Sequence, residues 1–168
     1  GNTTPAAAVT AAVLGGRPGD WVGPGTGVQG EALANKRRVV DDAVARVGDV
    51  TPLEALRRLG GRELAAMAGA TVAARHRGIP VLLDGFITTA AVVPLHLACP
   101  GALDHVWAGH GSAEPGHERQ LDAIGKEPLL TLDLRLGEGS GAVTAIPIVQ
   151  AACAAVVEVA TLEEFGLA

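Results

Sequence analysis

The chain has 168 residues and a formal net charge of −5, which is enough length for one domain with a hydrophobic core. Hydrophobic residues make up 48% of it, but Tyr is absent and Phe and Trp occur only twice each, so Ala, Val and Leu must build the core. The acidic balance and the lack of a basic run argue against a nucleic acid as the main partner.

The N-terminal part, up to Gly78, predicts helices joined by glycine-rich turns, and we predict no strand in it. Helix starts are indicated by a capping residue followed by proline, as in Thr51-Pro52, and helix ends by glycines, as in Gly60-Gly61. A loop rich in Gly and Pro is expected over residues 17–30. The predicted helices cover residues 5–14, 31–47, 52–59 and 62–76.

After Gly78, apolar runs alternate with helical patterns. Ile79-Pro80-Val81-Leu82-Leu83-Asp84 is a short continuous apolar run, which is typical of a buried parallel strand. Further strands are predicted over residues 103–107 and 129–134, a loop over 109–116, and helices over 87–99, 118–124 and 142–160. This alternation predicts an α/β fold with a parallel sheet, of which the chain supplies a part.

Two features indicate where the protein works. Cys99 and Cys153 form no metal or redox spacing, so we expect buried thiols and a reducing, cytoplasmic location. The uncharged run over residues 139–157 approaches the length of a membrane span. Because it is rich in alanine and contains Pro147 and Gln150, we expect a buried helix and no membrane partner.

One carboxylate lies in a glycine-rich turn, Arg135-Leu136-Gly137-Glu138-Gly139-Ser140-Gly141, between a predicted strand and the last predicted helix. Such a turn places backbone N–H groups and the positive end of a helix beside whatever it holds. Glycines also let a ligand approach the backbone closely. Glu138 is therefore either an ordinary acid at a helix start or a base directed at a bound substrate.

Two segments are candidates for phosphate binding. Gly25-Thr26-Gly27-Val28-Gln29-Gly30 has the spacing of the dinucleotide fingerprint but lacks the buried strand that should precede it. The loop could instead bind a single phosphate together with Lys36, or be a plain connection with Lys36 in solvent. Gly1-Asn2-Thr3-Thr4 suits either a phosphate cradle or simple helix capping.

Further polar residues have open roles. His105, His110, Glu114 and His117 could ligate zinc, but their spacing fits no closed motif, so we expect no metal. Ser112 does not lie in a Gly-x-Ser-x-Gly elbow, and a hydrogen bond to ligand or backbone is its expected role. Asp84 ends a predicted strand, where α/β sheets bind ligands, or it caps the following helix.

Taken together, six motifs in order make the chain similar to the C-terminal half of the nicotinate-nucleotide–dimethylbenzimidazole phosphoribosyltransferase family, over nearly all of its length. The motifs are Gly1-Asn2-Thr3-Thr4, Gly23-x-Gly25-Thr26-Gly27, Ala66-Met67-Ala68-Gly69-Ala70, Ile79 to Phe86, Ser112-x-Glu114-Pro115-Gly116-His117 and Arg135 to Gly141. The resemblance implies a Rossmann-like three-layer fold, a homodimer, and no cofactor or metal.

The resemblance also implies a reaction and a set of roles. The phosphoribosyl group of nicotinate mononucleotide moves to 5,6-dimethylbenzimidazole, giving α-ribazole 5′-phosphate and nicotinate for cobalamin synthesis, and Glu138 is the general base. Asp84 and Arg135 are further candidates for substrate binding. The residues expected at the ribose phosphate are Gly1, Asn2, Thr3, Thr4, Lys36, Ser112, Leu136 and Gly137.

The chemistry of this reaction needs one carboxylate. The pyridine of the donor carries a positive charge at its glycosidic nitrogen and can leave without an acid, whereas the incoming benzimidazole must lose its ring proton. The resemblance places the N-terminal half of the enzyme, with much of the benzimidazole pocket, outside this chain. The alternative is a non-catalytic phosphate- or nucleotide-binding module, or one half of a split assembly.

Overall fold

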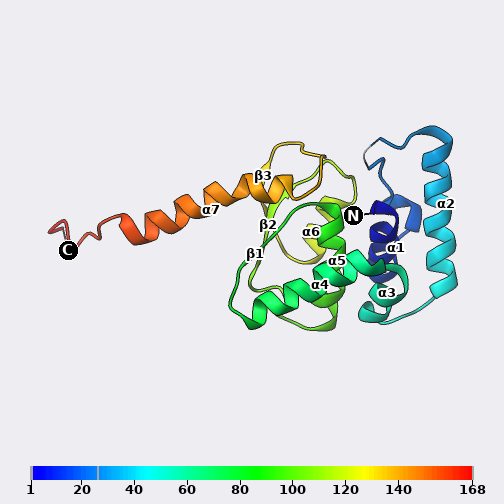
Figure 1. The fold of residues 1–168 in the computed structure, drawn as a ribbon, viewed down its shortest axis with the longest axis horizontal. Coiled ribbons are helices and arrows are strands. Elements are labelled where there is room, and N and C mark those ends of the chain that lie inside the picture. The colour runs from blue at the N-terminus through cyan, green and yellow to red at the C-terminus, as the bar shows by residue number, and fades with distance from the viewer. Residues whose placement is uncertain (1, 26, 168) are drawn as a thin grey trace.

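The computed structural model describes residues 2–25 and 27–167, so the roles predicted for Gly1 and Thr26 fall outside the described residues. Figure 1 shows the order and arrangement of the elements. The helices are α1 (Thr3–Leu14), the short 3-10 helix η1 (Pro18–Trp21), α2 (Gly30–Val47), α3 (Pro52–Leu59), α4 (Gly61–His76), α5 (Phe86–Ala98), α6 (His117–Ala123) and α7 (Ser140–Glu158). The strands are β1 (Val81–Leu83), β2 (Val106–Gly111) and β3 (Pro128–Thr131).

The described strands form one parallel sheet in the order β1-β2-β3. Val106 and Ala108 of β2 pack into a core cluster with residues of α5 and α6. Gly109, which points to the opposite face, lies against Ala142 of α7. Because successive strand residues face opposite sides, helices cover both faces of the sheet, which confirms the predicted α/β fold.

The N-terminal helices pack against α5 through small side chains. In α1, Ala6, Ala7 and Val9 are fully buried, and they share a core cluster with Ala90 and Ala91 of α5. Alanine on both sides lets the two helices approach closely, so a core can form with few aromatic residues. The predicted alanine-rich core is confirmed.

The second strand lies further along the chain than the sequence predicted. The prediction placed a strand over residues 103–107 and a loop over 109–116, whereas β2 runs from Val106 to Gly111. Gly109, one of the glycines that suggested a loop, instead lets the backbone of α7 come close to that of β2. A Cβ atom on Gly109 would lie 2.8 Å from the Cα atom of Ala142 and 3.0 Å from the carbonyl oxygen of Leu83. The predicted loop over residues 17–30 likewise contains η1.

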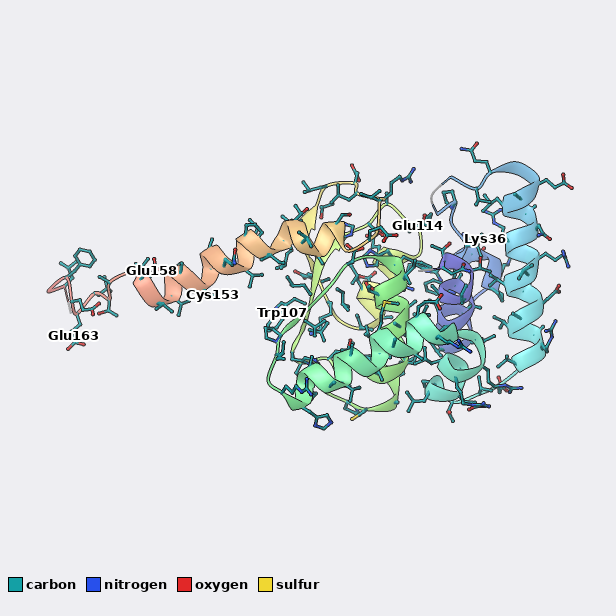
Figure 2. The ribbon with its side chains drawn as sticks, in the orientation of Figure 1. Lys36, Trp107, Glu114, Cys153, Glu158 and Glu163 are labelled. Carbon is teal, nitrogen blue, oxygen red and sulfur yellow. The ribbon has the colours of Figure 1, made fainter. Side chains whose placement is uncertain are left out.

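Two predictions of burial are wrong. Cys99 and Cys153 are both exposed, and α7 buries only Gly141 and Ala145, both near its start. Figure 1 shows α7 extending away from the sheet, and Figure 2 shows Cys153 on the extended part. A helix is buried only where other segments pack against it. The strands β2 and β3 contact α7, and its buried residues, Gly141 and Ala145, lie in its first turns. The helix is long and apolar enough to cross a membrane, which alone is weak evidence for a span.

Candidate functional site

A cavity of about 550 Å³ lies at the carboxyl ends of β1 and β2, where parallel sheets commonly bind ligands. Most residues predicted for the site line it together, although they come from distant parts of the chain. These are Asn2, Thr3, Asp84, Ser112, Arg135, Leu136, Gly137 and Glu138. The cavity is also lined by residues that the sequence did not single out for it, including Glu63, Met67, Thr88, His110 and Glu114.

Two predicted residues lie elsewhere. Thr4 lines a separate hollow between α1, α2 and α3, and its backbone N–H group donates a 3.0 Å hydrogen bond to the Asn2 side chain. Asn2 therefore caps α1 while its side chain also borders the cavity. Lys36 does not line the cavity, but its ammonium group donates a hydrogen bond to Thr3, which does line it.

Glu138 is exposed and lies in a run of left-handed backbone, with φ of 76° at Gly137, 60° at Glu138 and 79° at Gly139. For a residue with a side chain this conformation costs roughly 1–2 kcal/mol, so it persists only where the surroundings impose it. Glu138 comes two residues before Ser140, the first residue of α7. Glu138 is one of the residues that line the cavity.

Asp84 holds this turn. Its buried carboxylate accepts hydrogen bonds from the backbone N–H groups of Gly139, Gly141 and Ala142, at 3.2, 2.9 and 3.2 Å. His110 Nε2 lies 3.4 Å from the same carboxylate. Asp84 thus caps α7, not the helix that follows it in sequence, and its negative charge faces the positive end of the α7 dipole.

We expect Asp84→Asn to lower the free energy of unfolding by about 1–2 kcal/mol. The amide has one acceptor oxygen where the carboxylate has two, and it lacks the negative charge that the positive end of α7 favours. Urea unfolding followed by circular dichroism measures the change. Asp42→Asn is the matched control, since Asp42 pairs with Arg38 at the surface and exposed ion pairs contribute little. Equal losses in the two variants would show that Asp84 is not a special cap.

Gly141 is required by a direct contact between α7 and β2. A Cβ atom on this residue would overlap Cδ2 and Nε2 of His110. Both partners are buried, so a side chain could be accommodated only by moving His110 or the start of α7. The absence of a side chain here keeps the helix start, Asp84 and the Glu138 turn in register.

We expect Gly141→Ala to destabilise the fold by about 1–3 kcal/mol through overpacking, although alanine normally stabilises a helix interior relative to glycine. Gly69→Ala is the control, because a Cβ atom on Gly69 in α4 would meet nothing within 4 Å. Thermal unfolding of both variants provides the comparison. A gain in stability for Gly141→Ala would contradict the close contact.

Lys36 connects α2 to the start of α1 and to the glycine-rich loop. Its Nζ atom donates to Thr3 Oγ1 at 2.7 Å and to the carbonyl oxygen of Gly23 at 2.8 Å. Burial lowers the pKa of Lys36 below its ordinary value, and the nearby Glu114 carboxylate opposes this shift. Because Thr3 is the first residue of α1, the hydrogen bond to it places the Lys36 ammonium group at the N-terminal end of that helix. A helix N-terminus favours a bound anion.

Glu114 packs over the backbone of Gly23. A Cβ atom on Gly23 would overlap Oε2 of Glu114 and lie 2.9 Å from Cδ of Pro115, so no other residue fits at position 23 without a shift. Figure 2 shows Glu114 and Lys36 in the region around the start of α1. This contact joins the loop that follows β2 to the loop that precedes α2.

The histidines that could have formed a metal site have separate roles. His105 Nε2 lies 3.0 Å from the carbonyl oxygen of Thr71, on the α4 side of the sheet. His110 lies beside Asp84, and His117 contacts Thr89 and Ser112. Within residues 2–25 and 27–167, no group of His, Cys, Asp or Glu side chains is arranged to hold a metal ion.

Some of these contacts had no signal in the sequence. Met67 lies in one of the six motifs, and its position at the cavity could have been suspected from that alone. From the sequence, His110 and His117 are candidate metal ligands, because nothing nearby in sequence indicates that one lies beside Asp84 and the other behind Ser112.

A family model described as Phosphoribosyltransferase matches residues 1–167. The nicotinate-nucleotide–dimethylbenzimidazole phosphoribosyltransferase of Methylorubrum extorquens is 55% identical over 170 residues, which cover 99% of this chain and 50% of the relative. This chain belongs to the nicotinate-nucleotide–dimethylbenzimidazole phosphoribosyltransferase family.

Other members of this phosphoribosyltransferase family match the chain over the same extent. The Allorhizobium ampelinum relative is 56% identical over 169 residues, again 99% of this chain and 50% of the relative. The crystal structure of CobT from Thermus thermophilus superposes with a TM-score of 0.91 at 49% identity, and it covers all of this chain and 50% of the solved one. The chain therefore has the fold of half of a family member, and spans about half the length of the relatives it matches.

Proposed function

We propose that this chain supplies the phosphoribosyl-binding and general-base part of an enzyme that moves phosphoribose from nicotinate mononucleotide to 5,6-dimethylbenzimidazole. The products are α-ribazole 5′-phosphate and nicotinate. One observation supports the proposal: a single cavity is lined by Thr3, by Ser112 and by the strained turn that carries Glu138. The Lys36 ammonium group donates a hydrogen bond to Thr3.

The phosphate of the donor fits the end of the cavity at α1. The helix N-terminus offers backbone N–H groups and a positive dipole, and Lys36 adds a full charge beside Thr3. Ser112 has a buried hydroxyl with no hydrogen-bond partner among the described residues. We propose that Thr3, Lys36 and Ser112 bind the phosphate and orient the ribose toward Glu138.

Glu138 acts as the general base in this proposal. As one ring nitrogen of the benzimidazole attacks the anomeric carbon, the other loses its proton to the carboxylate. The positively charged pyridine leaves as a neutral nicotinate ring, so no acid, cofactor or metal is needed for its departure. A β-linked donor that gives an α-linked product implies one inverting displacement, which suits a single base and no protein nucleophile.

A chimera tests the proposal. This chain replaces the matching half of the Methylorubrum extorquens relative, and chromatography measures α-ribazole 5′-phosphate formed from the two substrates. We expect turnover in the chimera and its loss when Lys36 is replaced by Ala, because the phosphate is then held less firmly. A chimera that folds and binds neither nicotinate mononucleotide nor benzimidazole by calorimetry would refute the proposal.

The second candidate is one half of a split assembly, with a phosphate-binding role of its own. It is favoured by the exposed apolar side chains of α7, among them Val143, Ile148, Val156 and Val157. Sedimentation of this chain with the other half of the Methylorubrum extorquens relative should give a one-to-one complex. Val156→Asp should weaken the complex without harming the fold, since that side chain is 84% exposed. Self-association of the chain alone would indicate the homodimer instead.

A further inference from the structure

We propose that His117 and Thr89 are positioning residues that hold Ser112 in place for the substrate, an inference that rests on the proposed function. Ser112 follows β2, Thr89 lies in α5 and His117 is the first residue of α6. The three come from separate elements, yet one continuous line of hydrogen bonds joins them.

The hydrogen bonds determine which ring nitrogen of His117 carries the proton. The backbone N–H group of Ser112 can only donate, and it lies 2.9 Å from Nδ1, so Nδ1 must be the unprotonated acceptor. Nε2 therefore carries the proton and donates to Thr89 Oγ1 at 3.0 Å. The Thr89 hydroxyl in turn donates to the carbonyl oxygen of Gly85 at 3.0 Å. Every donor in the line meets an acceptor.

Burial keeps this arrangement in the neutral form. His117 and Thr89 are both 0% exposed, so neither can exchange its partner for solvent. Burial, and secondarily the charge of His110, lower the pKa of His117 to about 4, although Asp84 acts in the opposite direction. At neutral pH the ring is uncharged, and it can accept from Ser112 and donate to Thr89 at the same time.

The line of hydrogen bonds connects two walls of the cavity. Gly85 and Ser112 both line it, and a Cβ atom on Gly85 would lie 3.4 Å from Ser112 Cβ and 3.5 Å from its Oγ. Because the Ser112 backbone is tied to His117, its side chain stays against Gly85. The Ser112 hydroxyl has no hydrogen-bond partner among the described residues, so it can bond to a ligand without first breaking another contact.

Thr89→Val tests the role of this line of hydrogen bonds, because it keeps the shape of the side chain and removes only the hydroxyl. Thr71→Val is the matched control, since Thr71 Oγ1 also donates to the carbonyl oxygen four residues before it, at 2.9 Å. His105 contacts the backbone carbonyl of Thr71, which the substitution keeps, and not its hydroxyl. Calorimetry on this chain with nicotinate mononucleotide should show about tenfold weaker binding for Thr89→Val and wild-type affinity for Thr71→Val. Thr89→Ser should restore the affinity.

Nitrogen-15 NMR of the histidines supplies a signature that a loss of stability alone would not produce. In the wild type, His117 should be a single tautomer with Nδ1 unprotonated, and in Thr89→Val this preference should weaken. Equal affinity for Thr89→Val and Thr71→Val, with nicotinate mononucleotide bound by the wild type, would overturn the positioning role and leave the proposed function intact. If the wild type binds no nicotinate mononucleotide, the proposed function fails, and the positioning role fails with it.

Discussion

Turnover by the chimera is expected to fall by roughly 10²–10⁴-fold when Glu138 is replaced by Gln, because that is the contribution of a well-placed general base. The amide has nearly the shape of the carboxylate but cannot take the benzimidazole proton. Glu138 precedes α7, and the carboxylate that caps this helix is that of Asp84, so the substitution should leave the fold intact. Affinity for nicotinate mononucleotide should change little, since the phosphate end of the cavity is elsewhere.

The measurement compares initial rates with affinity by calorimetry for the same variant. Glu63→Gln is the control, because Glu63 is another carboxylate that lines the cavity but does not lie on the strained turn. It should retain most of the activity. Near-normal turnover in Glu138→Gln, with folding intact, would remove Glu138 from the role of base.

The free energy of unfolding should fall by about 3 kcal/mol between neutral pH and pH 4 through His117 alone. The pKa of His117 is about 4 in the folded chain and near its ordinary value of 6.5 in the unfolded chain. Between pH 6.5 and pH 4, His117 is therefore mostly protonated in the unfolded chain and mostly neutral in the folded chain. The stability from neutral His117 is fully present above pH 6.5, declines as the pH falls, and is lost once the pH passes 4.

Urea unfolding at several pH values isolates this contribution when the wild type is compared with His117→Gln. The variant should be less stable at neutral pH but should depend less steeply on pH between 6.5 and 4. His76→Gln, at an exposed position, serves as the control and should keep the wild-type slope. His110 and Asp84 also face His117, so a variant at either would change the midpoint of the transition. Parallel curves for the wild type and His117→Gln would refute the prediction.

Local patterns predicted the elements well where a single segment carries its own signal. The Thr51-Pro52 start and the glycine after Val47 correspond to the observed ends of α3 and α2. The apolar run before Asp84 became β1, and the glycine-rich turn precedes α7 as expected. Capping and periodicity depend on residues a few positions apart, so these signals survive folding.

Predictions of burial and of single contacts depended on distant residues, and several failed for that reason. Cys99 and Cys153 are exposed, although cysteine is usually buried. Gly109 looked like a loop residue because the backbone of α7, which it contacts, lies far along the sequence. Capping of the helix that follows it was one of the two roles predicted for Asp84, and no local pattern indicates that it caps α7.

The sequence by itself determined the parallel α/β alternation, the alanine-rich core and the placing of Glu138 in a backbone that glycine makes flexible. Only the tertiary structure decided that Asp84 caps a helix 57 residues away at Gly141, that His117 supports Ser112, and that α7 stays exposed. The physical reason is that parallel strands bring their carboxyl ends together across long stretches of chain. Hydrogen-bond partners and burial at that edge are therefore set by neighbours in space, which no local pattern encodes.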